Sequence, residues 1–230
     1  MSATKLIDLQ NLSDEEVKER WETAYLRFET PEEETRKFLS RLKRLSADRW
    51  HRDSDIVEIF CGRGNGLDAL RSLGFERLSG VDLSAELVAQ YHGPAKMHVA
   101  DCRQMPLPDR SCDIVIVQGG LHHLATLPAD LDRVLSEVCR VLRPDGKFVM
   151  VEPWLTPFLT AVHFASKLRF LKLLSPKLDA LAAMIHYEAP TYFRWLDSKP
   201  SILDLLAERF DTLYMHEGFG KLNFIGRPKQ

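Results

Sequence analysis

Five short apolar runs between residues 55 and 152 constrain the fold of this chain more than any other feature. They are rich in β-branched residues and read IVEIF, LSGVD, KMHVA, CDIVIV and KFVMVE. Segments with helical periodicity separate several of them: GLDALRSLGF, SAELVAQYH and ADLDRVLSEVCRVL. Strands that alternate with helices are the signature of βαβ units and a parallel sheet. CDIVIV and KFVMV are almost wholly apolar, as strands covered on both faces should be.

The segments on either side predict helices and a closing strand pair. Ser13 and Glu16 fit a capping box that opens a helix to about Phe28, and Pro31 begins a second helix. After the fifth run, a long apolar stretch of helical propensity predicts an inserted lid. SILDLLAERF predicts a last helix, and DTLYMHEGFG and KLNFIGRP predict two antiparallel strands at the sheet edge, joined by Gly-Phe-Gly.

Composition argues against several classes of protein. The formal charge is -2 at pH 7, so no global basic field points to nucleic acid. The N-terminal stretch carries acids and lacks an apolar core, which does not fit a secretory signal. The longest uncharged stretch lies between Glu152 and Lys167 and is too short to span a bilayer. Four cysteines without C-x-x-C spacing support no metal or redox motif, and we expect free thiols in the cytoplasm.

The stretch VEIFCGRGNG, residues 57–66, indicates a cofactor or anion site. Glycines after a strand let a ligand approach the backbone, and the following helix presents free N–H groups. A Walker loop needs a lysine at position 67, and a dinucleotide fingerprint needs a third glycine there. Leu67 occupies that position, so neither template fits. A third template, acid-x-Gly-x-Gly-x-Gly, fits at Glu58, Gly62 and Gly64.

That template resembles the class I S-adenosylmethionine-dependent methyltransferases, and the resemblance covers about residues 55–152. Asp82 ends the second run, where the acid of this family binds both ribose hydroxyls. Asp101 ends the third run, where an acid or amide of the family reads the adenine amino group. MPLPDRSCDIVIV and RVLRPDGKFVMVE resemble the fourth and fifth strand regions of the small-molecule branch, which includes quinone-biosynthesis methyltransferases.

The resemblance implies S-adenosyl-L-methionine as cofactor and in-line methyl transfer to a small or lipid-like acceptor. The residues that it implies for cofactor binding are Glu58, Cys61, Gly62, Gly64, Asp82, Leu83, Asp101, Cys102 and Gln118. Two alternatives stay open: a non-catalytic protein that binds the same cofactor, and a nicotinamide-dependent oxidoreductase.

We therefore expect an α/β protein with a Rossmann-like, doubly wound, mainly parallel seven-stranded sheet. A chain of 230 residues fits a single domain. Its expected parts are an N-terminal helical cap (1–50), the cofactor-binding core (51–152), a helical lid (153–200), and the last helix with the antiparallel strand pair (201–230).

One residue departs from the family pattern. Phe60 stands where the family prefers glycine. Phenylalanine tolerates a positive φ poorly. We therefore expect an ordinary backbone conformation at this position, with the ring held in a pocket.

Candidate catalytic residues follow the fourth run, in QGGLHHLATLP, which lies beside the cofactor in this architecture. His122 and His123 are candidate proton acceptors. The alternative is that one of them bonds locally or touches the cofactor. Adjacent histidines on a helix are expected to point apart, so no metal site is predicted.

Candidate acceptor contacts come from two further places, and a candidate cover for the cofactor comes from a third. Glu152 and Trp154 end the fifth run, and Tyr192 lies in the polar and aromatic stretch YEAPTYFRWL. Trp154 is equally suited to the core, and Tyr192 is equally suited to packing within the lid. Tyr25 and Phe28 belong to the N-terminal helix that covers the cofactor in this family, and packing against the sheet is the alternative.

The first part of the lid is basic. Between residues 153 and 178 its charges are Lys167, Arg169, Lys172 and Lys177, without an acid. Such a segment is a candidate for peripheral contact with an anionic membrane or an acidic substrate. A lid helix with a solvated basic face is the simpler interpretation.

Overall fold

The computed structural model describes residues 14–168 and 175–229 and contains a seven-stranded sheet of order β3-β2-β1-β4-β5-β7-β6. All neighbouring strands run parallel except the pairs β5–β7 and β6–β7. The mainly parallel α/β sheet is thus confirmed. The strands are β1 (Ile56–Ile59), β2 (Leu78–Asp82), β3 (Lys96–Val99), β4 (Cys112–Gln118), β5 (Leu142–Pro153), β6 (Phe210–Gly218) and β7 (Lys221–Pro228).

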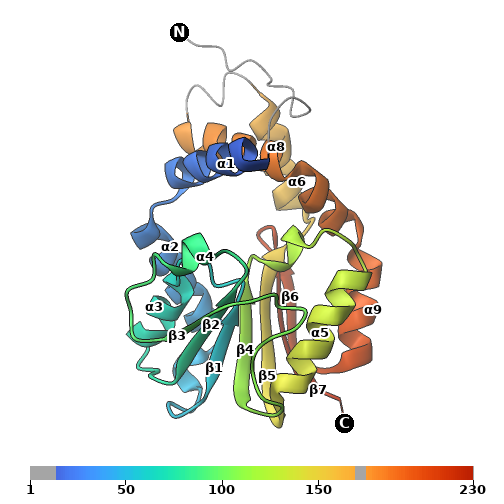
Figure 1. The fold of residues 1–230 in the computed structure, drawn as a ribbon. Coiled ribbons are helices and arrows are strands. Elements are labelled where there is room, and N and C mark those ends of the chain that lie inside the picture. The colour runs from blue at the N-terminus through green and yellow to red at the C-terminus, as the bar shows by residue number, and fades with distance from the viewer. Residues whose placement is uncertain (1–13, 169–174, 230) are drawn as a thin grey trace.

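The helices form two layers and a cap (Figure 1). One face of the sheet is covered by α2 (Pro31–Arg44) and α3 (Asn65–Ser72), and the other by α5 (Ala129–Val141) and α9 (Lys199–Arg209). The cap over the carboxyl ends of the parallel strands consists of α1 (Asp14–Phe28), α6 (Pro157–Lys167) and α8 (Pro176–Asp197). Three short elements complete the part of the chain that the structure describes: η2 (Ala47–Arg49), α4 (Ala85–Val88) and η3 (Leu121–His123).

Strand β4 lies near the middle of the sheet and contributes to both cores. Val115 and Val117 belong to the apolar cluster under α5 and α9, whereas Ile114 and Ile116 belong to the cluster under α2 and α3. Successive side chains of a strand point to opposite faces, so a strand between two helical layers is apolar at nearly every position. This explains the unbroken apolar run CDIVIV.

Local signals account for the start of α2. Thr30 accepts a hydrogen bond from the backbone N–H of Glu33, whose side chain accepts one from the N–H of Thr30. Pro31 is the first helical residue, as predicted, and acids fill the first turn while bases fill the last. The N-cap predicted at Ser13 lies outside the described residues, as do the lid residues Arg169 and Lys172.

Two details of the sheet concern turns. The Gly-Phe-Gly hairpin forms as expected, with positive φ at both Phe219 (49°) and Gly220 (72°) between β6 and β7. The Pro-Asp-Gly turn before the fifth strand does not end the pairing. Leu142 already pairs with Cys112, and the register then shifts before Lys147 pairs with Ile114.

Candidate functional site

The glycine loop joins β1 to α3 and is tied to the end of β2. Gly62 and Gly64 have φ values of 52° and 81°, which favour glycine. The backbone N–H of Gly62 donates to Asp82 Oδ2 (2.7 Å), and the N–H of Ser84 donates to Asp82 Oδ1 (2.8 Å). An ionised carboxylate offers about four acceptor sites. Asp82 therefore holds the loop and keeps acceptor capacity for further donors.

The ordinary backbone conformation expected at Phe60 was wrong. Its φ is 54°, in the left-handed region. The ring packs on the core beside Gly120, and a Cβ added at Gly120 would lie 2.2 Å from the Cβ of Phe60. Packing of the ring thus offsets backbone strain of order 1 kcal/mol, and the absence of a side chain at Gly120 makes this packing possible.

Glu58 is buried beneath the loop. Its Oε1 accepts from Gln118 Nε2 (3.5 Å), and burial raises the pKa of Glu58 to about 8. A Cβ at Gly66 would lie 1.9 Å from Glu58 Oε1, so glycine at position 66 leaves room for the carboxyl group. Within the described part of the chain, Glu58 Oε2 and Gln118 Oε1 are buried without a hydrogen-bond partner. Two orphaned oxygens at one place suit a ligand that donates several hydrogen bonds, such as an ammonium group, whose positive charge would favour the ionised form of Glu58.

The acid after β3 is already engaged. Asp101 accepts from Nε and Nη2 of Arg103, whose Nη1 donates to Asp130 (2.8 Å). The bonds from Arg103 hold the pKa of Asp101 below its ordinary value. Beside this pair Leu83 is 71% exposed, which is high for a large apolar side chain next to Asp82. An adenine ring would cover such a surface, so both residues stay predictions for cofactor binding.

The two cysteines assigned to the cofactor site are buried. Cys61 and Cys102 belong to the apolar wall between the glycine loop and β3. Burial raises the pKa of the Cys61 thiol and raises that of Cys102 to about 12. At neutral pH both side chains are therefore thiols that pack as small apolar groups, without the reactivity of a thiolate.

Glu152 and His122 form a buried pair at the ends of β5 and β4. Glu152 Oε1 accepts from the backbone N–H groups of Gly120 (2.7 Å) and Leu121 (2.8 Å), and its Oε2 lies 2.8 Å from His122 Nδ1. Burial alone would raise the pKa of Glu152, but these hydrogen bonds outweigh it and hold the pKa below its ordinary value. The ionised carboxylate can only accept, so Nδ1 of His122 carries a proton and Nε2 points away from Glu152.

The two histidines do not point apart, contrary to the expectation for adjacent residues on a helix. Their ring centroids lie 4.2 Å apart, with the planes tilted by 35°. The physical reason is local: both belong to the three-residue 3-10 turn η3 rather than to an α-helix. The ring of Tyr192 on α8 meets the edge of His122 at 6.1 Å between centroids, and its hydroxyl lies 3.0 Å from His163 Nε2.

The structure distributes the other candidates between core and cap. Trp154 has no exposed surface and lies in the core, with Lys199 Nζ 4.7 Å above its ring. Tyr25 of α1 donates its hydroxyl hydrogen to Glu34, which also accepts from Asn65 of α3. The cap is thus fastened to the helix that follows the glycine loop.

Two residues near the site were not predicted from the sequence. His163 lies on α6 and reaches Tyr192 across the lid. Lys221 opens β7 beside the end of β5, where burial, with a further effect of the positive Arg41, lowers its pKa to about 7. No motif marks either residue, because their positions depend on the packing of the lid and on the sheet order.

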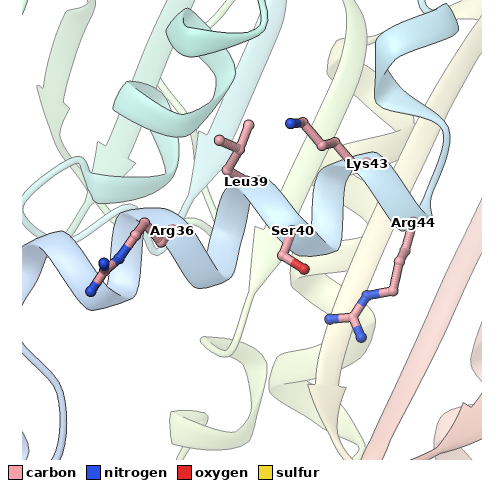
Figure 2. A pocket seen from close by; sticks show the side chains of 5 residues that line it. All are labelled: Arg36, Leu39, Ser40, Lys43 and Arg44. Atoms are coloured by element: carbon pink, nitrogen blue, oxygen red, sulfur yellow. The ribbon is translucent and has the colours of Figure 1, made fainter.

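A shallow depression on the surface does not coincide with this site. Figure 2 shows it on α2, lined by Arg36, Leu39, Ser40, Lys43 and Arg44. All five belong to one helix, and they lie on its surface rather than at the ends of β1, β2 and β4. The converging polar groups are elsewhere, at the strand ends.

Comparisons with known proteins show which proteins this chain is similar to. Residues 57–150 match the model of a methyltransferase domain family. The chain is 24% identical over 203 residues to a demethylmenaquinone methyltransferase of Symbiobacterium thermophilum, which covers 77% of this chain and 76% of that protein. It is 29% identical over 176 residues to the ubiquinone/menaquinone biosynthesis C-methyltransferase UbiE of Rubrivivax gelatinosus, covering 70% of this chain and 64% of the relative.

Residues 57–150 of this chain form a class I S-adenosylmethionine-dependent methyltransferase domain. Solved structures show the same fold. A protein of Pyrococcus horikoshii OT3 superposes with a TM-score of 0.68 at 18% identity, over 91% of this chain and 98% of that one. A methyltransferase of Methanosarcina mazei gives 0.56 at 17% identity, over 80% and 96%.

The family sets aside the oxidoreductase alternative, in agreement with the missing third glycine at Leu67. Among the residues that the structure describes, no helix of the methyltransferase has the length and apolar character needed to cross a membrane. The division into cap, core, lid and terminal strand pair stays a prediction.

Proposed function

We propose that this methyltransferase methylates a small or lipid-like acceptor with a ring system, of the quinone type, by in-line displacement. The observation that carries the proposal is a group of rings between the strand ends and the lid: Tyr192 of α8 meets both His122 of η3 and His163 of α6 edge to face. Flat side chains that converge beside apolar walls suit a flat, apolar acceptor. The names of two relatives, which concern menaquinone and ubiquinone, point to the same class.

The cofactor would lie along the glycine loop. Gly62 and Gly64 would bring the backbone near its methionine part, Glu58 and Gln118 would accept hydrogen bonds from its ammonium group, and Asp82 would accept from its ribose hydroxyls. When bound, the cofactor supplies an electrophilic methyl group. The task of the protein is then to align the acceptor with that group and to exclude water.

His122 and His123 would assist the loss of a proton from the acceptor. A neutral hydroxyl or a carbon acid needs such assistance, whereas a phenolate does not. Glu152 orients His122 through Nδ1, so Nε2 faces the lid, where it lies 3.9 Å from Glu188 Oε2. Glu152 is accordingly a positioning residue, because its oxygens already accept hydrogen bonds from the backbone of Gly120 and Leu121 and from His122.

Calorimetric titration with S-adenosylmethionine and S-adenosylhomocysteine tests the first half of the proposal, with NAD as control. We expect one-to-one binding of both sulfur compounds and no response to NAD. Incubation with labelled cofactor and a panel of quinols, phenols and unrelated amines tests the second half. Label on the amines alone would contradict the quinone-like acceptor. Binding without transfer to any acceptor would favour the non-catalytic alternative.

The lid would also contact the membrane in which a lipid-like acceptor resides. Phe158 and Phe164 of α6 are 52% and 66% exposed, and Phe158 meets the exposed Phe219 of the β6–β7 hairpin at 5.9 Å. Lys177 does not support this contact by charge, because it pairs with Glu33. Co-sedimentation with vesicles containing anionic lipid should fall for Phe158→Ser with Phe164→Ser. Equal binding of the wild type and the double variant would contradict the proposed contact.

A further inference from the structure

Three side chains with metal-binding atoms converge between η3 and α8. His122 Nε2 lies 3.9 Å from Glu188 Oε2, and His123 Nδ1 lies 3.7 Å from Glu188 Oε1. One ligand atom from each residue can be chosen so that all lie within 4.8 Å of one another. The group joins adjacent residues of a turn after β4 to a residue of the lid that follows them by more than sixty positions.

Glu152 prepares His122 for this geometry. Its Oε2 accepts a hydrogen bond from Nδ1–H of His122, and its Oε1 accepts from two backbone N–H groups. The lone pair of His122 is thereby placed on Nε2, the nitrogen nearest to Glu188. A carboxylate that holds one ring nitrogen while the other binds a metal is the usual support of a metal-ligating histidine.

We propose that His122 Nε2, His123 Nδ1 and a Glu188 carboxylate oxygen bind a divalent transition-metal ion. Two imidazole nitrogens and one carboxylate select zinc or a neighbouring transition metal over magnesium or calcium, which prefer all-oxygen sites. In a tetrahedral site with bonds of about 2.1 Å, ligand atoms lie roughly 3.4 Å apart. The separations of 3.7 and 3.9 Å involve different oxygens of Glu188, and the three ligand atoms lie within 4.8 Å of one another, so the side chains would have to close around the ion by up to about 1.4 Å.

The use of the ion rests on the proposed function, but its binding does not. Three protein ligands leave a position open, as in catalytic rather than structural sites. An acceptor hydroxyl at that position would bind as its oxyanion and release its proton to solvent. The histidines would then assist the acceptor by holding a cation instead of taking the proton themselves. Glu188 would also draw α8, and with it the lid, toward the strand ends.

Metal titration of the chelator-treated, full-length protein tests the site. The probes are Zn²⁺ in calorimetry and Co²⁺, whose visible absorption reports nitrogen and oxygen ligation. We expect one ion per chain for the wild type, and an affinity at least about tenfold lower for His123→Ala and for Glu188→Gln. His216→Ala and Glu208→Gln are the matched controls, on β6 and α9, and should bind as the wild type does.

Several outcomes would overturn the proposal. One is that the wild type binds no ion; another is that His123→Ala and Glu188→Gln bind as tightly as the two controls. Since the His123 side chain is 40% exposed, His123→Ala decides the matter if Glu188→Gln fails to fold. A titration of the same samples with S-adenosylhomocysteine separates the two proposals. Intact cofactor binding without metal binding removes only the metal site, and the reverse removes only the cofactor site.

Discussion

The carboxylate of Asp82 accepts a hydrogen bond from the backbone N–H of Gly62 at 2.7 Å, across twenty positions of the chain. The bond joins the end of β2 to the glycine loop after β1. It gives one acid two tasks, because the same oxygens are the candidate acceptors for the ribose hydroxyls. A change at this residue should therefore affect both loop order and cofactor affinity.

Asp82→Ala should weaken S-adenosylhomocysteine binding by at least about tenfold. Hydrogen bonds to a charged group contribute about 1.5–3 kcal/mol each, and about 1.4 kcal/mol is a tenfold change in affinity. Calorimetry measures the loss, with circular dichroism to establish folding. Asp53→Ala removes an exposed acid and is the matched control. Unchanged affinity in a folded Asp82→Ala protein would remove Asp82 from the cofactor site.

The stability of the protein without cofactor should fall as pH rises toward 8, and Glu58→Gln should remove much of this fall. The pKa of Glu58 is about 8 in the fold against an ordinary value of 4.5. The folded state therefore holds a proton that the unfolded state has lost, so stability is full below about 4.5 and declines as pH rises through about 8.

Urea unfolding between pH 5.5 and 9 measures this effect. The free energy of unfolding of wild type and Glu58→Gln should diverge with pH, and the variant should be the more stable at pH 9. Glutamine keeps an oxygen to accept from Gln118 and cannot ionise. Parallel curves for the two proteins would show that Glu58 is ionised in the fold at neutral pH.

Gly120→Ala should destabilise the fold by about 1–3 kcal/mol, the usual cost of overpacking. The new Cβ would lie 2.2 Å from the Cβ of Phe60. Thermal unfolding should show a lower Tm, by about 2–4 °C for each kcal/mol in a chain of this size.

A double-mutant cycle isolates the contact between these two residues. Phe60→Gly removes the ring and relieves the positive φ at the same time. In that background Gly120→Ala should cost much less than in the wild type. Additive effects would mean that the loop after β4 moves away from Phe60 and that the close packing is not required.

Glu152→Gln should change the tautomer of His122 while leaving cofactor affinity within about threefold. Glutamine can accept from the N–H groups of Gly120 and Leu121 with its oxygen, but its amide group then donates to His122 Nδ1. The ring should carry its proton on Nε2 in the variant and on Nδ1 in the wild type. Nitrogen-15 shifts of the ring distinguish the two forms, and zinc affinity should fall by about 10- to 100-fold. The same tautomer in both proteins would show that Glu152 does not orient His122.

Local sequence signals predicted most of the elements, and their failures have identifiable causes. The second helix begins at Pro31 as predicted and ends at Arg44, two residues before Ser46, which adopts a left-handed conformation with φ 58°. Phe60 was misjudged because the strain at one residue was weighed without the packing of its ring beside Gly120. The cost of a positive φ can be predicted from the residue type at position 60. The packing that offsets this cost involves Gly120, sixty positions away.

The sequence by itself determined the parallel sheet, the glycine loop and the acids at the strand ends. These features are local: strand periodicity is written in successive residues, and the carboxyl ends of parallel strands meet at one edge whatever the loops do. Only the tertiary structure decided that Glu152 binds His122 and the backbone after β4, that Glu188 faces both histidines, and that Trp154 lies in the core. Those contacts depend on how the lid packs over the sheet, and no periodicity or spacing in the chain encodes that packing.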